Sequence, residues 1–450
     1  MSSLSSYRGS GLATFLSAAA VVLFSVVQLR ADDYWSAASG DWSNSANWSA
    51  GYTPTPADTA TISGTVSVTL SGAVAEQVYA GGGGGYGPSG FSGYLQMESG
   101  SLAVTDDISI AGGESTNAYG SIVQSGGSVS ASNLWMGGPW GSSGTYYLNG
   151  GQLNLSGSSY EGITQGLQIG QAALCTFNQS GGTLNVAGII VGGGWGASGA
   201  YNLSGGQVVA GTEAIGMDQR WGQGSSGTFT QSGGNNSANS LVLGYFGGDS
   251  GTFNLNGGLL TLATGPSLGG GSGTFNFGSG TMGASAPWSS SLNMNMSGVG
   301  GSGIVDTTGG NITLSGNLSG IGGLVKAGSG TLTLSGTNTY SGVTTVMAGI
   351  LEIDNMTSLN NLLIYGADIQ GGELVLDWTG TDPIAAVQAD ISSGLFKDSL
   401  ATDVTLLCTD VNNQITVTVG AVPEPSTVVL LGIGAVSLLA YAWRRRRWTA

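Results

Sequence analysis

A unit of about 25 residues recurs along the middle of the chain, and this periodicity constrains the fold more than any other feature of the sequence. Each unit opens with a pattern close to Gly-Thr-aromatic, and its third residue is apolar in all eight copies. The copies start at Gly93, Gly120, Gly144, Cys175, Gly199, Gly227, Gly251 and Gly273. Their third residues are Leu95, Ile122, Tyr146, Phe177, Tyr201, Phe229, Phe253 and Phe275.

Each unit also holds three short stretches in which apolar residues alternate with other residues, separated by glycine turns. In the first unit, Leu95 is followed by the pair Leu102 and Val104, and then by the pair Ile108 and Ile110. A strand this short cannot bury its apolar face alone, but stacked units bury it in one continuous core. The pattern predicts an all-β fold, a right-handed single-stranded parallel β-helix with its aromatic column pointing inward.

The fifth position of the unit varies in an ordered way. It is glutamine in some units and leucine in the units between them, which indicates that a pair of coils was duplicated. The glutamines are Gln124, Gln179 and Gln231, and the leucines are Leu148, Leu203 and Leu255.

The repeat region is expected to span residues 93–322, between two atypical segments. Residues 32–92 carry Trp35, Trp42 and Trp48 near their start. Because the open end of a solenoid needs a cover, we interpret this segment as an N-terminal cap with the first strands. Residues 354–420 contain less glycine and are expected to form the C-terminal cap.

Between the repeats and the C-terminal cap, residues 323–353 read GLVKAGSGTLTLSGTNTYSGVTTVMAGILEI. This segment resembles the autotransporter-associated β-strand repeat, and the resemblance implies further β-helix coils. The positions that carry it are Lys326, Gly328, Gly330, Leu332, Leu334, Gly336, Asn338, Tyr340, Gly342, Thr344 and Gly349.

The segment 422–447 has three parts in a fixed order: Val422 with the triplet Pro423, Glu424 and Pro425, an apolar run of about 18 residues, and a basic cluster. The cluster consists of Arg444, Arg445, Arg446 and Arg447. An uncharged run of this length can span a bilayer as a transmembrane helix, and the arginines would stop it on the cytoplasmic side. The arrangement resembles the PEP-CTERM sorting signal, whereas an ordinary membrane anchor would not require the Pro-Glu-Pro triplet.

That resemblance implies a membrane-bound partner and a destination. In this family an exosortase-type protease cuts near the triplet, after the tail has held the exported protein in the inner membrane. The other end of the chain agrees, because residues 1–31 have the charged, apolar and small-residue layout of a secretory signal peptide. We therefore expect export, transient anchoring, and release to the cell surface or extracellular matrix of a Gram-negative-type bacterium.

Charge limits the partners of the exported part. Without the two terminal segments, Arg220, Lys326 and Lys397 are the remaining basic residues, against 24 acidic ones. Phosphate binding needs clustered lysine and arginine, so no nucleic-acid partner is expected.

Catalytic chemistry also has little support in the sequence. The chain has no histidine, which excludes Ser-His-Asp triads and histidine metal sites. The remaining candidates for a lyase-like site are Arg220 with Asp218, or the pair Asp106 and Asp107, and a surface ion pair is the simpler reading of the first. Lys326 lies in the repeat pattern, where a structural role is expected. We expect no catalytic residue, cofactor or metal.

An aromatic residue tends to occur shortly before the next unit begins. These residues are Trp140, Trp195, Trp221 and Phe246. In a stacked solenoid they would line one edge, where they could stack on sugar rings or simply pack on neighbouring turns.

The sequence as a whole favours an exported, non-catalytic structural or adhesive β-helix protein. Extracellular polysaccharide is a candidate partner of such a rod. A polysaccharide-binding or polysaccharide-cleaving enzyme on the same rod is the alternative.

Overall fold

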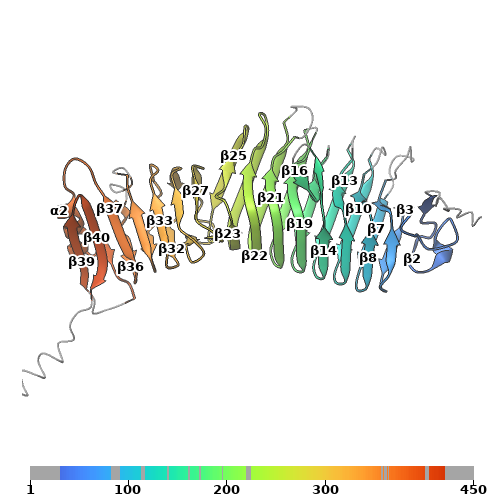
Figure 1. Ribbon diagram of the computed structural model, residues 1–450, viewed down its shortest axis with the longest axis horizontal. Helices are drawn as coiled ribbons and strands as arrows, with labels where there is room; N and C mark the ends of the chain where they lie inside the picture. The colour runs from blue at the N-terminus through green and yellow to red at the C-terminus, as the bar shows by residue number, and fades with distance from the viewer. Residues whose placement is uncertain are drawn as a thin grey trace, which may run out of the picture.

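The protein is an all-β parallel solenoid of about 13 turns, which forms the long rod in Figure 1. The computed structural model describes residues 31–82, 92–112, 117–138, 141–160, 163–171, 174–194, 196–218, 224–355, 358, 362, 364–400 and 405–420. The N-terminal coils lie at one end of the rod and the C-terminal strands at the other. The predicted parallel β-helix is confirmed.

Most coils contribute one strand segment to each of three faces. The first face consists of β2 (Ser39–Asp41), β4 (Thr65–Val68), β7 (Ser92–Met97), β10 (Tyr119–Gln124), β13 (Ser143–Leu148), β18 (Leu174–Gln179), β20 (Ser198–Leu203), the first parts of β22 (Ser226–Leu243) and β23 (Ser250–Leu262), β25 (Ser272–Phe277), β28 (Met294–Met296) and β31 (Leu318–Gly320).

The second face follows the first after a tight turn and runs almost the whole length of the rod. It consists of β5 (Ala73–Ala75), β8 (Ser101–Val104), β11 (Ser128–Ala131), β14 (Gln152–Leu155), the first parts of β19 (Thr183–Val191) and β21 (Gln207–Ile215), the later parts of β22 and β23, β26 (Thr281–Ala284), β29 (Gly303–Asp306), β32 (Leu324–Ala327), β34 (Thr344–Val346), β36 (Ala367–Ile369) and β38 (Phe396–Lys397).

The third face closes each coil in the N-terminal two thirds of the rod. It consists of β1 (Ala31–Tyr34), β3 (Asp58–Ile62), β6 (Gln77–Ala80), β9 (Asp107–Ile110), β12 (Asn133–Met136), β17 (Leu167–Ile169), the last parts of β19, β21 and β22, and β24 (Ser267–Leu268). A separate stack then takes its place, with β27 (Trp288–Ser290), β30 (Ile312–Leu314), β33 (Thr331–Leu334), β35 (Ile350–Ile353), β37 (Glu373–Asp377), β40 (Gln414–Gly420) and β39 (Thr405–Val411).

The register of the coils matches the repeat read from the sequence. Gly120 pairs with Gly93 on one side and with Gly144 on the other. Further along, Phe253 pairs with Phe229 and with Phe275. Residues at one position of the repeat therefore form a straight column along the rod.

The aromatic column lies inside the rod and is fully buried from Tyr146 to Phe275. Neighbouring rings are stacked nearly parallel, with centroids 4.4 Å apart between Tyr201 and Phe229 and 5.4 Å apart between Phe253 and Phe275. This spacing is close to the ~4.8 Å between hydrogen-bonded strands, so the rings stack without distorting the ladder.

Glycine pairs make the tight turn between the first and second faces. The second glycine of each pair has a positive φ, for example +81° at Gly206. A Cβ atom on Gly206 would lie 2.4 Å from the carbonyl oxygen of Gly181 in the preceding coil. Both the backbone conformation and the contact between coils therefore require glycine here.

The glutamine and leucine alternation at the fifth position has a partner in the aromatic column. Tyr146 Oη donates to Gln124 Oε1 of the preceding coil at 2.6 Å, and Tyr201 Oη donates to Gln179 Oε1 at 2.5 Å. Where the preceding coil has leucine, the ring is phenylalanine, which has no hydroxyl to satisfy. Gln231 is the exception, because the ring in the following coil is Phe253, which has no hydroxyl. The Oε1 atom of Gln231 therefore has no hydrogen-bond partner.

The rod ends in two different ways. At the N-terminal end Trp48 packs against Trp35 and Trp42, with ring centroids 5.0 and 4.9 Å apart, and the three rings are 2–3% exposed. A short helix η1 (Ser45–Asn47) precedes Trp48. At the C-terminal end the hairpin β39–β40 pairs antiparallel with β37 and ends the parallel stack.

Two elements were not expected from the sequence. Helix α2 (Ile384–Ser393) interrupts the strands of the C-terminal segment, with Val387 buried and Gly394 closing it in the left-handed conformation. The antiparallel hairpin β15 (Ser158–Tyr160) and β16 (Ile163–Gln165) projects between the second and third faces.

The acidic side chain of Glu213 points into the core of the rod. Glu213 occupies an inward column between Ile189 and Leu241 and is fully buried. Asn236 Nδ2 donates to Glu213 Oε2 at 3.2 Å, while Glu213 Oε1 and Asn236 Oδ1 have no partner. Burial raises the pKa of Glu213 to about 7, opposed by the hydrogen bond from Asn236. The neutral acid fits this site best, because it removes the buried charge and turns one acceptor into a donor.

We expect Phe253→Tyr to stabilise the fold by about 1 kcal/mol, because its hydroxyl would reach the unpartnered Gln231 Oε1 as in the two tyrosine pairs. The control is Phe229→Tyr, whose hydroxyl would face Leu203 of the preceding coil and should cost about 1–3 kcal/mol. Chemical denaturation measures both free energies of unfolding. Equal effects of the two substitutions would contradict this pairing rule.

Glu213 should make stability fall as pH rises. Its folded pKa of about 7 lies above the ordinary glutamate pKa of 4.5, so the folded state holds this proton more tightly than the unfolded chain. The contribution of Glu213 to the free energy of unfolding is fully present below pH 4.5. It falls by roughly 3 kcal/mol as the pH rises from 4.5 to 7. Glu213→Gln should remove that part of the pH dependence. If the free energy of unfolding changes with pH in the same way in the wild type and in Glu213→Gln, the raised pKa of Glu213 is refuted.

Candidate functional site

The middle of the rod presents almost no charge to solvent. Among the described residues from 117 to 305, Glu213, Asp218 and Asp249 are the charged side chains, and they are 0, 4 and 1% exposed. Glu161 and Arg220 also belong to this stretch but lie outside the described residues. The remaining acids of the described chain lie toward the two ends, so the central surface suits an uncharged partner.

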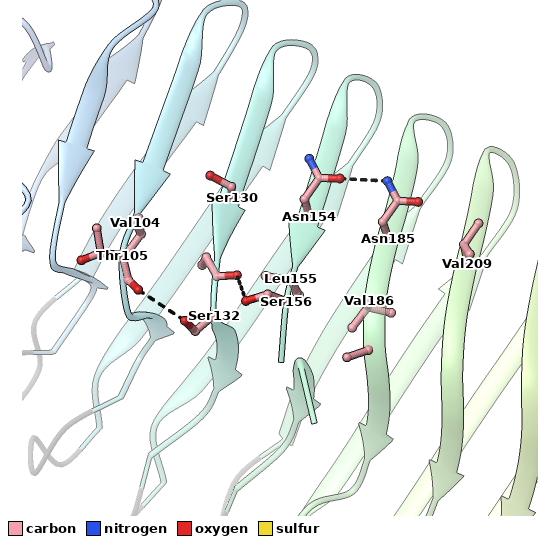
Figure 2. Close-up of a pocket in the computed structure, with 12 residues that line it drawn as sticks. Val104, Thr105, Ser130, Ser132, Asn154, Leu155, Ser156, Asn185, Val186 and Val209 are labelled. Carbon is pink, nitrogen blue, oxygen red and sulfur yellow. Dashed lines mark hydrogen bonds between the residues drawn. The ribbon is translucent and has the colours of Figure 1, made fainter. Parts of the chain in front are cut away.

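An open groove of about 580 Å³ runs along the second face across successive coils. Figure 2 shows its side chains on neighbouring strands, arranged along the rod. The lining residues are Val104, Thr105, Ser130, Ala131, Ser132, Asn154, Leu155, Ser156, Asn185, Val186, Ala187 and Val209. None of them is an acid or a base, and hydroxyl and amide groups alternate with small apolar groups.

Hydrogen bonds between coils hold the polar side of this groove. Asn185 Nδ2 donates to Asn154 Oδ1 at 2.8 Å, and both amides keep further hydrogen-bonding capacity toward solvent. Ser132 Oγ donates to the carbonyl oxygen of Thr105 at 3.3 Å, and Ser156 Oγ to that of Ala131 at 3.5 Å. Val209, which is 41% exposed, adds an apolar contact at one end. The groove thus offers rows of fixed polar and apolar contacts to an extended molecule lying along the rod.

Sequence reasoning did not find this groove. Its position depends on the bend between the second and third faces, where residues such as Ala131 and Ala187 are small. The signal that could have found it is the pair of asparagines, Asn154 and Asn185, at one outward position of neighbouring units.

The aromatic edge expected from the sequence falls mostly outside the described residues. Trp140, Trp195 and Trp221 all lie there, so their common side of the rod remains a prediction. Phe246 is described and is 40% exposed. Its ring meets that of Tyr245 edge-on, with centroids 4.8 Å apart.

Asp106 and Asp107, one of the two pairs considered for catalysis, accept hydrogen bonds from side-chain amides of adjacent coils. Asn133 Nδ2 donates to Asp107 Oδ1 at 2.7 Å, and Gln77 Nε2 donates to Asp106 Oδ2 at 2.8 Å. Burial raises the pKa of Asp107, partly offset by the bond from Asn133. Asp218 is buried, and its backbone N–H donates to Asp249. Arg220 lies outside the described residues, so its predicted proximity to Asp218 stays a prediction.

Lys326 is fully buried in the coil formed by residues 323–353. Its Nζ donates to the carbonyl oxygens of Ala327, Gly328 and Ala348 at 2.8–2.9 Å, which uses all three of its N–H bonds. Burial lowers the pKa of Lys326 to about 8, opposed by the charge of Asp306. These bonds link the turn of one coil to that of the next.

The two cysteines are free thiols, with Cys175 buried and Cys408 half-buried. No group of three or more acidic or cysteine side chains in the described chain is arranged to hold a metal ion.

Two family models match segments of the chain. A passenger-associated-transport-repeat matches residues 324–353, and a PEP-CTERM protein-sorting motif matches residues 421–447. The chain carries both modules. The sorting motif implies an exported protein that is anchored transiently and processed by an exosortase, a membrane protease.

Other comparisons add no relative. No curated protein and no solved structure matches the chain significantly.

The sorting segment from Val422 to Arg447 lies outside the described residues, as does the predicted signal peptide. Within the part of the chain that is described, no helix is long and apolar enough to cross a membrane.

Replacing Pro423-Glu424-Pro425 with three alanines should leave membrane insertion intact but block processing, since the apolar run and the arginine cluster are unchanged. The full-length form should then accumulate in the membrane fraction, as detected by immunoblotting of fractionated cells. Changing Ser426 to alanine is the matched control and should be processed normally. An intact Arg444–Ala450 tail on the wild-type surface protein, found by mass spectrometry, would refute the sorting assignment.

Proposed function

We propose that this protein is a non-catalytic adhesive and structural rod on the surface of a Gram-negative-type cell, and that its axial groove holds neutral polysaccharide. The observation that carries the proposal is the groove on the second face, whose twelve lining residues include no acid or base. The sorting motif supports a location where such polymers occur.

The chemistry of the groove suits a sugar polymer. The amides of Asn154 and Asn185 can both donate to and accept from hydroxyl groups, as can Ser130. Val209, which is 41% exposed, supplies the apolar surface that can cover the C–H groups of a sugar ring, whereas Leu155 and Val186 are only 3 and 7% exposed. The groove lining therefore offers hydrogen-bonding groups to sugar hydroxyls and apolar surface to sugar C–H groups.

The periodicity of the groove favours a polymer over a small molecule. Coils repeat every ~4.8 Å along the rod, so an extended chain meets similar groups at each step. Weak contacts repeated along one chain raise the overall affinity without a deep pocket.

Charge favours a neutral polymer over an acidic one. The protein has a formal net charge of −16, and among the described residues the exposed acids lie toward both ends of the rod. A polyanion would be repelled by these ends, while a neutral polymer on the middle of the rod would not be.

The test uses two matched pairs of asparagines on different faces. Asn154→Ala with Asn185→Ala removes the groove amides, whereas Asn178→Ala with Asn202→Ala removes a similar hydrogen-bonded pair, 2.9 Å apart, from the first face. In a pull-down with neutral polysaccharide, the groove variant should bind roughly tenfold more weakly, because two hydrogen bonds are lost. The first-face variant should bind like the wild type.

Three further readouts separate the alternatives. Acidic polysaccharide should be retained poorly by all three proteins, and no shortened glycan should appear during incubation. Thermal unfolding should be similar in both variants, which excludes a general loss of structure. Equal retention by the groove variant and the wild type would refute the groove as the binding site, and glycan shortening would refute the non-catalytic role.

A further inference from the structure

The first face forms a parallel sheet that carries no charged residue over nine neighbouring strands, from β7 to β28. Within these strands no Asp, Glu, Lys or Arg occurs, inward or outward. The outward positions form columns of small polar residues in the later coils, such as Ser226, Ser250 and Ser272. Larger exposed residues stand on the earlier coils, where Tyr94, Tyr119, Tyr147 and Leu174 are 37–65% exposed.

This face is fixed in place on both of its sides. Beneath it, the buried rings of the aromatic column stack at 4.4–5.4 Å and keep the coils evenly spaced. On the solvent side of the sheet, side-chain amides link neighbouring coils. Asn276 Nδ2 donates to Asn254 Oδ1 at 2.8 Å, and Asn295 Nδ2 donates to Asn276 Oδ1 at 2.9 Å. The outward side chains therefore lie in regular rows with little freedom left to lose on binding.

The size of the face matches a stable protein interface. Eight stretches of six residues and the three-residue strand β28, at ~4.8 Å between strands and ~3.4 Å per residue, give roughly 830 Å² on one copy. Standard interfaces bury about 800 Å² on each partner. The polar rows alone would cover less, so the tyrosine-bearing coils are part of this surface.

We infer that the first face is a self-association surface, on which a second copy of the chain stacks face to face. A second copy presents the same rows of side chains at the same spacing between coils, so the rows on the two copies can align along their whole length. Sheets built from stacked, in-register strands are known to pair through dry, interdigitated interfaces, and asparagine ladders add to their stability. The absence of charge on the strands means that no like charges are brought together where the copies meet.

A two-fold arrangement identifies the residue at the centre of this interface. β20 is the fifth of the nine strands, and Ala200 is the middle of its three outward residues, between Ser198 and Asn202. A two-fold axis lying in the interface, either along the rod or across it, brings Ala200 of one copy opposite Ala200 of the other. Gln207 is the matched control, because it is exposed on the second face of the same coil and does not line the groove.

The first experiment is cysteine cross-linking of the exported protein on cells of the native host, in a Cys408→Ser background. Cys175 is 1% exposed and should not react. Ala200→Cys should give a disulfide-linked dimer under mild oxidation, and Gln207→Cys should remain monomeric. Failure of Ala200→Cys to cross-link, or equal cross-linking at both positions, would overturn the inference.

The second experiment measures association of the exported protein by sedimentation. The wild type should dimerise with increasing concentration, and Ala200→Arg should weaken dimerisation at least about a hundredfold, because it places two like charges opposite each other. Gln207→Arg should dimerise like the wild type. A wild type that stays monomeric, including one that instead binds polysaccharide through this face, would overturn the inference. Glycan retention by the groove does not enter either readout, so the proposed function is tested separately.

Discussion

The structure depends on the stacking of like residues in register from one coil to the next. No single coil has a core of its own, because its three short strands bury their apolar side chains only when another coil lies above and below. The aromatic column expresses this most clearly, since Phe253 is buried by Phe229 on one side and by Phe275 on the other. A slip of one residue would turn such a column to the outside, so the register is strongly specified. The Gln–Tyr pairs add a polar constraint with the same period.

The register that builds the core also orders the surface. When inward residues form columns, the outward residues between them do so as well, and a repeated sequence then repeats its surface chemistry every coil. In the middle of this chain that chemistry is serine, threonine and asparagine, with no exposed charge among the described residues from 117 to 305. Axial rows of one composition suit long or repetitive partners better than compact ones. The in-register stacking of the coils therefore produces both the groove and the polar rows of the first face, which lie on different sides of the same coils.

The sequence predicts the repetitive parts of the molecule well and the unique parts poorly. The inward columns, the glycine turns and the coil boundaries follow from local periodicity, and residue pairing confirms them from Gly93 to Gly273. The pair Glu213 and Asn236 could not be foreseen, because each residue replaces an apolar one in a different column and they meet only across the interior. Helix α2 and the terminal hairpin lie where the repeat has ended and periodicity offers no guide. The groove was missed for another reason: its depth depends on the bend between two faces.

The two ends of the rod determine how such a surface can be used. A parallel β-helix with open ends would add further chains along its axis, since each terminal coil offers unpaired backbone groups. At one end the buried tryptophans and Asp33, which accepts hydrogen bonds from Ser49 and Ala50, close the first coils. At the other end the antiparallel hairpin replaces the parallel ladder with a strand order that no identical coil can continue. Acids are also concentrated at these ends, where they disfavour end-to-end contact between copies. With axial addition disfavoured at both ends, the sides of the rod are where the proposed contacts with glycan and with a second copy would form, and such lateral contacts would favour partners that match its rows.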